Sequence, residues 1–216
     1  MTTADARFWD GTAARYAERP LPNPDSTRRK LDIIRSHLRP DHVLLDVGCG
    51  TGTIALELAG HARDVHGIDL SGEMVRIARD KAASRGADHV QFHVDGALEG
   101  LSRFEDGSVD VLCAFNILHL VPDRDAVLRR AFAVLRAGGV FVSSTPCLGG
   151  GLIPYRSLIT VMRWFGKAPP VACFDADALL ASVRDAGFSE LTQPDVGAQK
   201  RVAFVVASKA SAPQPG

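Results

Sequence analysis

Residues 43–59 read Val-Leu-Leu-Asp-Val-Gly-Cys-Gly-Thr-Gly-Thr-Ile-Ala-Leu-Glu-Leu-Ala, and the fold prediction starts from this stretch. Residues 43–47 are β-branched residues and leucines around one acid, which is typical of a buried parallel strand. Gly48, Gly50 and Gly52 interrupt this strand, and helix-forming residues follow them directly. The stretch therefore predicts a strand, a glycine loop and a helix whose N-terminus faces a ligand at the loop.

Three classes of ligand use such a loop. A phosphate loop of the Walker type requires a Lys after the glycines, and none follows here. Gly50, Gly52 and Ala55 match the dinucleotide pattern G-x-G-x-x-G/A, so an NAD-linked dehydrogenase stays open. Asp46 precedes the first glycine by two residues; its charge would repel a pyrophosphate but suits an ammonium or sulfonium group.

The acid and the glycines together resemble a known motif. Residues 46–52, Asp-Val-Gly-Cys-Gly-Thr-Gly, resemble motif I, (D/E)-x-G-x-G-x-G, of the class I S-adenosylmethionine (SAM)-dependent methyltransferases. The resemblance implies SAM as the cofactor and a Rossmann-like fold. It implies cofactor contacts from Asp46, Gly48, Cys49, Gly50, Thr51 and Gly52.

The N-terminal phrase Phe-Trp-Asp-Gly-Thr-Ala-Ala-Arg-Tyr-Ala, residues 8–17, resembles the arm of small-molecule methyltransferases of the ubiquinone and menaquinone biosynthesis type. The resemblance implies that residues 1–40 form an arm and lid, with Tyr16 over the SAM site. Residues 13–18 are expected to form a short helix. The alternative is an arm that only packs over the sheet.

A second strand is expected at residues 64–68, followed by Asp69. Asp69 lies 17 positions after Gly52, close to the spacing at which nucleotide-binding α/β folds place a ribose-binding acid. Ser71 is expected to cap the next helix. Residues 66–74 resemble motif II of the family, which implies that Leu70 and Met74 line the adenine side. A simple helix-terminal charge is the alternative role for Asp69.

A third strand is expected at residues 89–94, and it stops at Asp95-Gly96-Ala97. In the fold that the resemblance implies, Asp95 accepts the adenine amino group, and the backbone at Gly96 and Ala97 contacts the ring. Because Asp-Gly is also a common turn, a purely structural role stays open.

The fourth strand is expected at residues 109–115, and Asn116 at its end is expected to contact the cofactor. Parallel strands in such folds end at the ligand crevice, so His119 is the candidate general base. A histidine that only orients the loop is the alternative. Asp110 resembles the acid that opens motif IV, where its role is mostly structural.

The second half of the chain is expected to complete the sheet. We expect a helix at 123–136 that ends at Gly138-Gly139, and a fifth strand at 140–144. A helix from Asp175 to Gly187 precedes an antiparallel hairpin, residues 188–193 and 201–208, and the tail 209–216 is expected to be disordered. Before the first strand, residues 27–38 are expected to be helical with Asp25 or Ser26 as the N-cap.

Residues 147–174 form an insertion after the fifth strand, where the resemblance implies an acceptor-site cover. Leu158, Met162 and Phe165 share one helical face. Such an apolar cover indicates a lipophilic or aromatic acceptor. A core-packing helix, a helix that forms a homodimer, and weak contact with a membrane surface are the alternatives.

The composition narrows the partners. The 216 residues carry 25 basic and 25 acidic side chains, so nucleic acid is not an expected partner. The four cysteines lie far apart, which predicts neither a metal site nor a disulfide framework. No signal peptide and no membrane-spanning stretch is visible, so a cytoplasmic location is expected.

The sequence thus predicts a single domain over residues 1–208, with a Rossmann-like, seven-stranded, mostly parallel sheet, helices on both faces and an antiparallel C-terminal strand. The predicted activity is methyl transfer from SAM to a small acceptor. A non-catalytic SAM-binding module and an NAD-linked dehydrogenase are the rivals. Methylation of amines in nucleic acid is disfavoured, because those enzymes resemble (Asp/Asn/Ser)-Pro-Pro-(Tyr/Phe) after the fourth strand, where this chain has Phe-Asn-Ile-Leu at 115–118.

Overall fold

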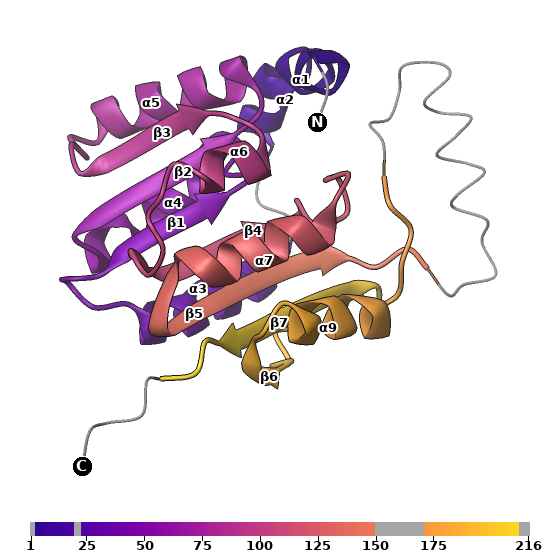
Figure 1. Ribbon diagram of the computed structural model, residues 1–216. Helices are drawn as coiled ribbons and strands as arrows, with labels where there is room; N and C mark the ends of the chain where they lie inside the picture. Colours follow the sequence, from indigo (N-terminus) through magenta and orange to yellow (C-terminus); the bar gives the residue numbers. More distant parts are fainter. Residues whose placement is uncertain (1–2, 20–22, 150–170, 212–216) are drawn as a thin grey trace.

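A computed structural model describes residues 3–19, 23–149 and 171–211. Its centre is one seven-stranded sheet with the order β3-β2-β1-β4-β5-β7-β6 (Figure 1). Strands β3, β2, β1, β4 and β5 pair in parallel, and β7 pairs antiparallel with both β5 and β6. The predicted sheet and its terminal hairpin are confirmed. The strands are β1 Val43–Val47, β2 Asp64–Asp69, β3 Val90–Val94, β4 Val109–Phe115, β5 Leu135–Pro146, β6 Ser189–Thr192 and β7 Val202–Ser208.

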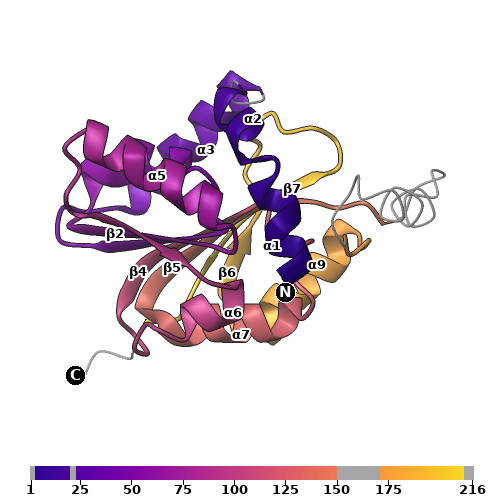
Figure 2. The same cartoon turned by 90° about the horizontal axis from the view of Figure 1, so that it is seen from above.

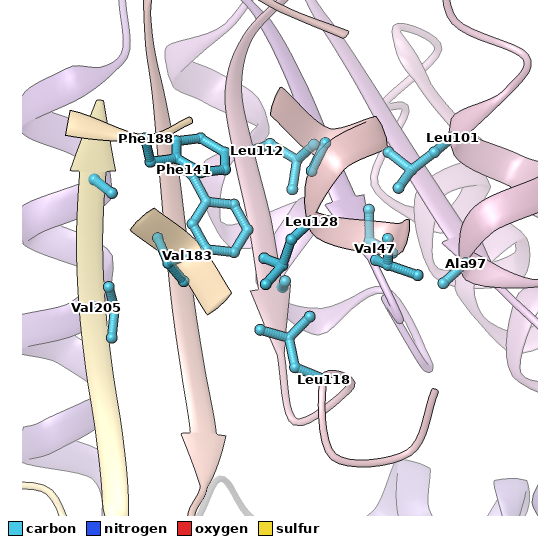
Figure 3. Close-up of a cluster of buried hydrophobic side chains, with 14 of the residues drawn as sticks. Val47, Ala97, Leu101, Leu112, Leu118, Leu128, Phe141, Val183, Phe188 and Val205 are labelled. Carbon is cyan, nitrogen blue, oxygen red and sulfur yellow. The ribbon is translucent and has the colours of Figure 1, made fainter. Parts of the chain in front are cut away.

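Helices cover both faces of the sheet (Figures 1 and 2). Helices α3, α4 and α5 pack on one face, and α6, α7 and α9 pack on the other. Figure 3 shows the core between the sheet and helices α6, α7 and α9, in which Phe141 of β5 lies among Leu128, Val183 and Phe188. The helices are α1 Thr3–Asp10, α2 Ala13–Glu18, α3 Pro24–His37, α4 Thr53–Leu58, α5 Gly72–Ser84, α6 Ala97–Leu101, α7 Arg124–Val134 and α9 Ala176–Asp185, with a 3-10 turn η1 at Ala59–His61.

The first strand lies at the centre because its side chains are buried on both faces. Leu44 belongs to the core under α3 to α5, and Leu45 belongs to the core under α6 and α7. Leu44 is level with Val65 of β2 and Val111 of β4, so apolar residues continue across the sheet. Strand β1 therefore fixes where the glycine loop leaves the sheet.

The N-terminal arm contains two helices, where the sequence predicted one. Helix α1 was missed, and both α1 and α2 lie against α5 (Figure 2). The predicted N-cap of the next helix was also wrong. Asn23 caps α3 instead of Asp25 or Ser26: it adopts φ 49°, and its side chain accepts a hydrogen bond from the Ser26 N–H at 3.2 Å. Asparagine tolerates this left-handed conformation, which explains the earlier start.

The boundary between α7 and β5 differs from the prediction of a helix over 123–136. Asp123 is the N-cap of α7, which ends at Val134, and the strand begins at once. Gly138 and Gly139 do not end the helix; they lie in an irregular part of the strand, where the pairing register with β4 shifts. The Gly138 N–H donates to the carbonyl of Lys209, whose own N–H donates to Gly139. Hydrogen bonds to Lys209 thus hold these glycines in the strand, and they do not form the helix end that the sequence pattern predicted.

The prediction that residues 209–216 form a disordered tail is wrong at Lys209. Its ammonium group donates to three carbonyl oxygens at the end of α7 and the start of β5, those of Phe132, Ala133 and Leu135. Order therefore continues past β7. Residues 212–216, and most of the predicted insertion with Leu158, Met162 and Phe165, lie outside the described residues. Among the helices of the described part, none is long and apolar enough to cross a membrane.

Candidate functional site

A cavity of about 280 Å³ opens at the carboxyl ends of β1, β2 and β4, where ligands bind in open α/β sheets. Strand ends, the glycine loop and the N-terminal arm all contribute to its wall. Ten residues of the wall were predicted from the sequence: Tyr16, Gly48, Gly50, Asp69, Leu70, Met74, Asp95, Ala97, Asn116 and His119.

The glycine loop turns tightly because its amide groups bond to β2. The N–H groups of Gly48 and Cys49 both donate to the carbonyl of Ile68, at 2.8 and 3.0 Å. The Gly50 N–H donates to a carboxylate oxygen of Asp69 at 2.8 Å. These three donors are therefore satisfied within the protein, and the loop is not a ready cradle for a pyrophosphate. This observation disfavours the dinucleotide interpretation.

Two of the glycines are required by close packing. Gly48 has φ +75°, and a Cβ there would lie 2.7 Å from Cβ of Ile117. Gly52 has φ +73°, and a Cβ there would lie 2.7 Å from Cζ of Phe92. Both positions exclude a side chain on conformational and steric grounds. Gly52 is not part of the cavity wall, and its missing side chain leaves room for Phe92 of β3 and Ala78 of α5.

Asp69 connects the loop to the next helix. One carboxylate oxygen accepts from Gly50 and the other accepts from the Ser71 N–H at 2.9 Å. Burial raises the pKa of Asp69, and the hydrogen bonds from Ser71 and Gly50 oppose that shift. The carboxylate is thus held in one orientation at the cavity wall, with lone pairs left for a ligand.

Asp46 lies behind the glycine loop and is only 2% exposed. Its Oδ1 atom has no hydrogen-bond partner among the described residues. Burial, and then the charge of Asp69, raise the pKa of Asp46 to about 7. A buried carboxylate with an unsatisfied oxygen is costly, and a nearby cation would relieve that cost.

Asp95 lies beside Asp69 in the cavity wall, directly after the end of β3. Its N–H donates to the Asp69 carbonyl at 2.9 Å, and its carboxylate pairs with Arg103. Helix α6 begins directly after it, at Ala97. Gly96 is the N-cap of this helix and lies against the Glu99 carboxylate rather than in the cavity wall.

The wall farthest from these acids is mostly apolar and comes from the segment after β4. Asn116 ends the strand with φ 55°, a conformation that asparagine tolerates. His119 follows, and its carbonyl accepts from the Ala172 N–H at 2.8 Å. Its Nδ1 atom is buried and has no partner in the described part of the chain. Burial lowers the pKa of His119 to about 4, so the imidazole is neutral near pH 7 and is a weaker base than an exposed histidine.

The N-terminal arm closes one side of the cavity. Tyr16 of α2 reaches toward Gly50 and remains 45% exposed. Asp10, at the end of α1, accepts from the Ser71 hydroxyl at 2.6 Å and from the Glu73 N–H at 3.2 Å. Since Ser71 also caps α5, Asp10 ties the arm to the helix that carries Met74.

Five residues predicted to contact the cofactor are not in the cavity wall: Asp46, Cys49, Thr51, Gly52 and Gly96. Cys49 points into the core under α4 and α5, and the Thr51 hydroxyl accepts from Lys81 at 3.0 Å. Five further wall residues were not predicted from the sequence: Trp9, Ile68, Phe115, Ile117 and Leu120. Ile68 and Phe115 stand at strand ends, which is a signal that was available. Nothing in the sequence pattern placed Trp9 there.

A methyltransferase domain model matches residues 38–175, which is more than half of the chain. The chain therefore belongs to this methyltransferase family. It is 32% identical over 207 residues to 27-O-demethylrifamycin SV methyltransferase of Amycolatopsis mediterranei, covering 94% of this chain and 72% of that protein. It is 31% identical over 140 residues to a ubiquinone biosynthesis O-methyltransferase of Xanthomonas axonopodis pv. citri, covering 64% of this chain and 56% of that protein.

Solved structures share the fold. Geranyl diphosphate C-methyltransferase of Streptomyces coelicolor, solved with S-adenosylhomocysteine, covers 98% of both chains with a TM-score of 0.70 and 17% identity. Phosphoethanolamine N-methyltransferase 2 of Haemonchus contortus, solved with SAM, covers 85% of this chain and 53% of its own, with a TM-score of 0.71 and 16% identity. Family membership and the site together define the protein as a SAM-dependent methyltransferase.

Proposed function

We propose that this protein transfers the methyl group of SAM to a small acceptor that is lipophilic or aromatic. The observation that carries the proposal is the pair of acids at the glycine loop. Asp69 lies on the cavity wall, and Asp46 lies behind the loop with an unsatisfied oxygen. An acidic end of this kind fits a cofactor that is positively charged and carries a sugar.

Different wall residues are assigned to different parts of the cofactor. We assign the ribose hydroxyls to Asp69, whose carboxylate is already oriented by its two amide donors. Asp95 and the adjoining Ala97 serve the adenine, with the apolar side chains of Leu70 and Met74 against the ring. These assignments follow from position on neighbouring strand ends.

The cationic end is assigned to the other acid. Asp46 attracts the ammonium group, and Gly48 and Gly50 leave space for that end of the molecule. Cys49, Thr51 and Gly52 maintain the shape of the loop and do not contact the cofactor through side chains. The side chains of Cys49 and Thr51 point into the protein, and Gly52 has none. Tyr16 and Asn116 both line the cavity, and we assign Tyr16 to the lid.

When bound, SAM supplies an electrophilic methyl group on a sulfonium, so the reaction needs no strong acid or base from the protein. The chain's main contribution is to hold the acceptor in line with that methyl group. His119 adds a neutral imidazole at the acceptor end of the cavity. We assign to His119 the role of accepting the proton that an acceptor hydroxyl loses during its attack on the methyl group.

The acceptor end is lined by Trp9, Phe115, Ile117 and Leu120. This wall favours an acceptor with an apolar or aromatic body. The relatives support a small-molecule acceptor by their names, which include O-methyltransferases and the sarcosine/dimethylglycine N-methyltransferase of Halorhodospira halochloris, 33% identical over 189 residues.

The test has two parts. Calorimetry with SAM and with NAD should show saturable binding of SAM alone; binding of NAD alone would support the dehydrogenase. The protein is then incubated with SAM and a panel of phenols, quinols and amines, and S-adenosylhomocysteine is measured. Production of S-adenosylhomocysteine with at least one acceptor is expected. Tight SAM binding with no product across the panel would support a non-catalytic SAM-binding module.

A further inference from the structure

Lys30 of α3 places a cation directly behind the acceptor end of the cavity. Its ammonium donates to the Ser144 hydroxyl at 2.8 Å and lies 5.9 Å from the centres of the Phe115 and Phe204 rings. Phe115 is part of the cavity wall. The carbonyl of Ser144 accepts from the N–H of Asn116, which is also in the wall. One layer of side chains therefore separates the ammonium from the cavity.

This cation has no anionic partner among residues 3–19, 23–149 and 171–211. No carboxylate there lies within ion-pair distance of Lys30, whereas Arg103 beside the same cavity pairs with Asp95. One of the three ammonium donors is used, by Ser144. Lys30 is partly buried, and its burial lowers its pKa, as expected for a cation that is desolvated without a counter-ion. An anion supplied by a ligand would offset that cost.

The charges around the cavity are unevenly distributed. The acids Asp69 and Asp95 lie toward β2 and β3, and Asp46 lies behind the glycine loop. The wall toward β4 and β5 contains no carboxylate within the described residues, and Lys30 stands behind it. A cationic acceptor would find no partner at that end, whereas an anionic acceptor would.

We propose that Lys30, positioned by the Ser144 hydroxyl, recognises a carboxylate-type anion on the acceptor while Phe115 contacts the acceptor's apolar body. Lys30 is then a specificity determinant, and the preferred acceptors are acidic aromatic or lipophilic molecules. This inference rests on the proposed function, because it concerns the acceptor half of the same cavity.

The test measures equilibrium binding, so it does not depend on knowing the acceptor. Binding of S-adenosylhomocysteine is first measured by calorimetry, which tests the cofactor half separately. The affinities of 2-naphthoate and of neutral 2-naphthamide are then measured with and without S-adenosylhomocysteine. We expect the wild-type protein to bind 2-naphthoate at least about 10-fold more tightly than the amide, because the unpaired charge of Lys30 attracts the carboxylate across one layer of side chains.

Three variants and a control test whether the charge of Lys30 causes the preference for 2-naphthoate. Lys30→Met should abolish the preference for 2-naphthoate, Lys30→Arg should restore most of it, and Ser144→Ala should reduce it. Lys81→Met is the matched control, because Lys81 is also partly buried and also donates to a side-chain hydroxyl, that of Thr51. The control should keep the preference.

Two results would overturn the inference. One is a wild-type protein that binds 2-naphthoate no better than 2-naphthamide. The other is a folded Lys30→Met variant that keeps the preference and loses only thermal stability, since that would make Lys30 a packing clamp between α3 and β5. Neither result would affect the cofactor measurement.

Discussion

Asp46 has the most perturbed environment of any carboxylate at this site. The fold buries it and leaves Oδ1 without a partner among the described residues, which a protein tolerates where a ligand supplies the missing charge. Its position two residues before the first glycine made it visible in the sequence. Its burial and the charge of the neighbouring Asp69 were not visible, because they depend on how β1 and β2 pair.

Asp46 predicts how stability depends on pH. Its pKa in the folded protein is raised to about 7, so the folded state keeps a proton that the unfolded chain releases near pH 4. The free energy of unfolding without ligand should therefore fall between pH 4 and 7, by at most about 4 kcal/mol. Denaturant titrations at pH 5 and 8 should show this loss in the wild type and a smaller one in Asp46→Asn. Equal losses in both proteins would remove Asp46 as the cause.

His119 predicts a change in rate that leaves cofactor binding intact. If the neutral imidazole accepts the acceptor's proton, His119→Ala should lower kcat by roughly 10²- to 10⁴-fold, the usual range for general base catalysis. The affinity for SAM, measured by calorimetry, should be unchanged. A loss smaller than about threefold would assign His119 to orienting the loop after β4 rather than to proton transfer.

At the scale of elements, the glycine loop was predictable because its signals are local. Strand residues, spaced glycines and helix formers all lie within residues 43–59, and β1 and α4 appear there. The end of α7 was not predictable, because the strand that replaces the last helical turn is held by Lys209, far along the chain. The cap of α3 was missed because Asn23 acts in a left-handed conformation before Pro24.

The loop geometry predicts which glycine the element needs. Gly52→Ala places a methyl group 2.7 Å from Phe92 at a positive φ, so it should destabilise the protein by roughly 1–3 kcal/mol. Gly60→Ala is the control, because a Cβ at Gly60 meets no atom within 4 Å. Chemical denaturation of both variants measures the difference. Equal stabilities would show that the close contact at Gly52 relaxes at no cost.

The carboxylate of Asp10 ties the arm to α5. Asp10→Ala removes the acceptor that α1 offers to Ser71 and Glu73, so α1 and α2 should detach more often from α5. Limited proteolysis within residues 3–19 should become faster, and SAM should bind less tightly because Trp9 and Tyr16 leave the cavity wall. Asp80→Ala, which removes an exposed carboxylate of α5 paired with Arg76, is the control. Unchanged proteolysis and affinity in Asp10→Ala would exclude the latch.

At the scale of the whole molecule, the sheet order brings together residues that are distant in sequence. Because β1 lies between β2 and β4, Asp69 and His119 reach one cavity from different strands. That meeting was predictable, since parallel strands end on one side of a sheet. The contributions of Trp9 and Asp10 were not, because they require the docked position of the arm. The acceptor-site cover at 147–174 and the single domain over 1–208 stay predictions.

We expect SAM to lie at the ends of β1 and β2 with its ribose on Asp69, and calorimetric titration of SAM into wild-type and Asp69→Ala protein measures this contact. Loss of the charged partner should weaken binding by roughly 1.5 to 3 kcal/mol, about 10- to 150-fold. Asp69→Asn, which keeps an oxygen for Ser71 or Gly50, separates loss of charge from disorder of the loop, and Asp80→Ala should bind like the wild type. A folded Asp69→Ala variant with wild-type affinity for SAM would show that Asp69 does not bind the ribose.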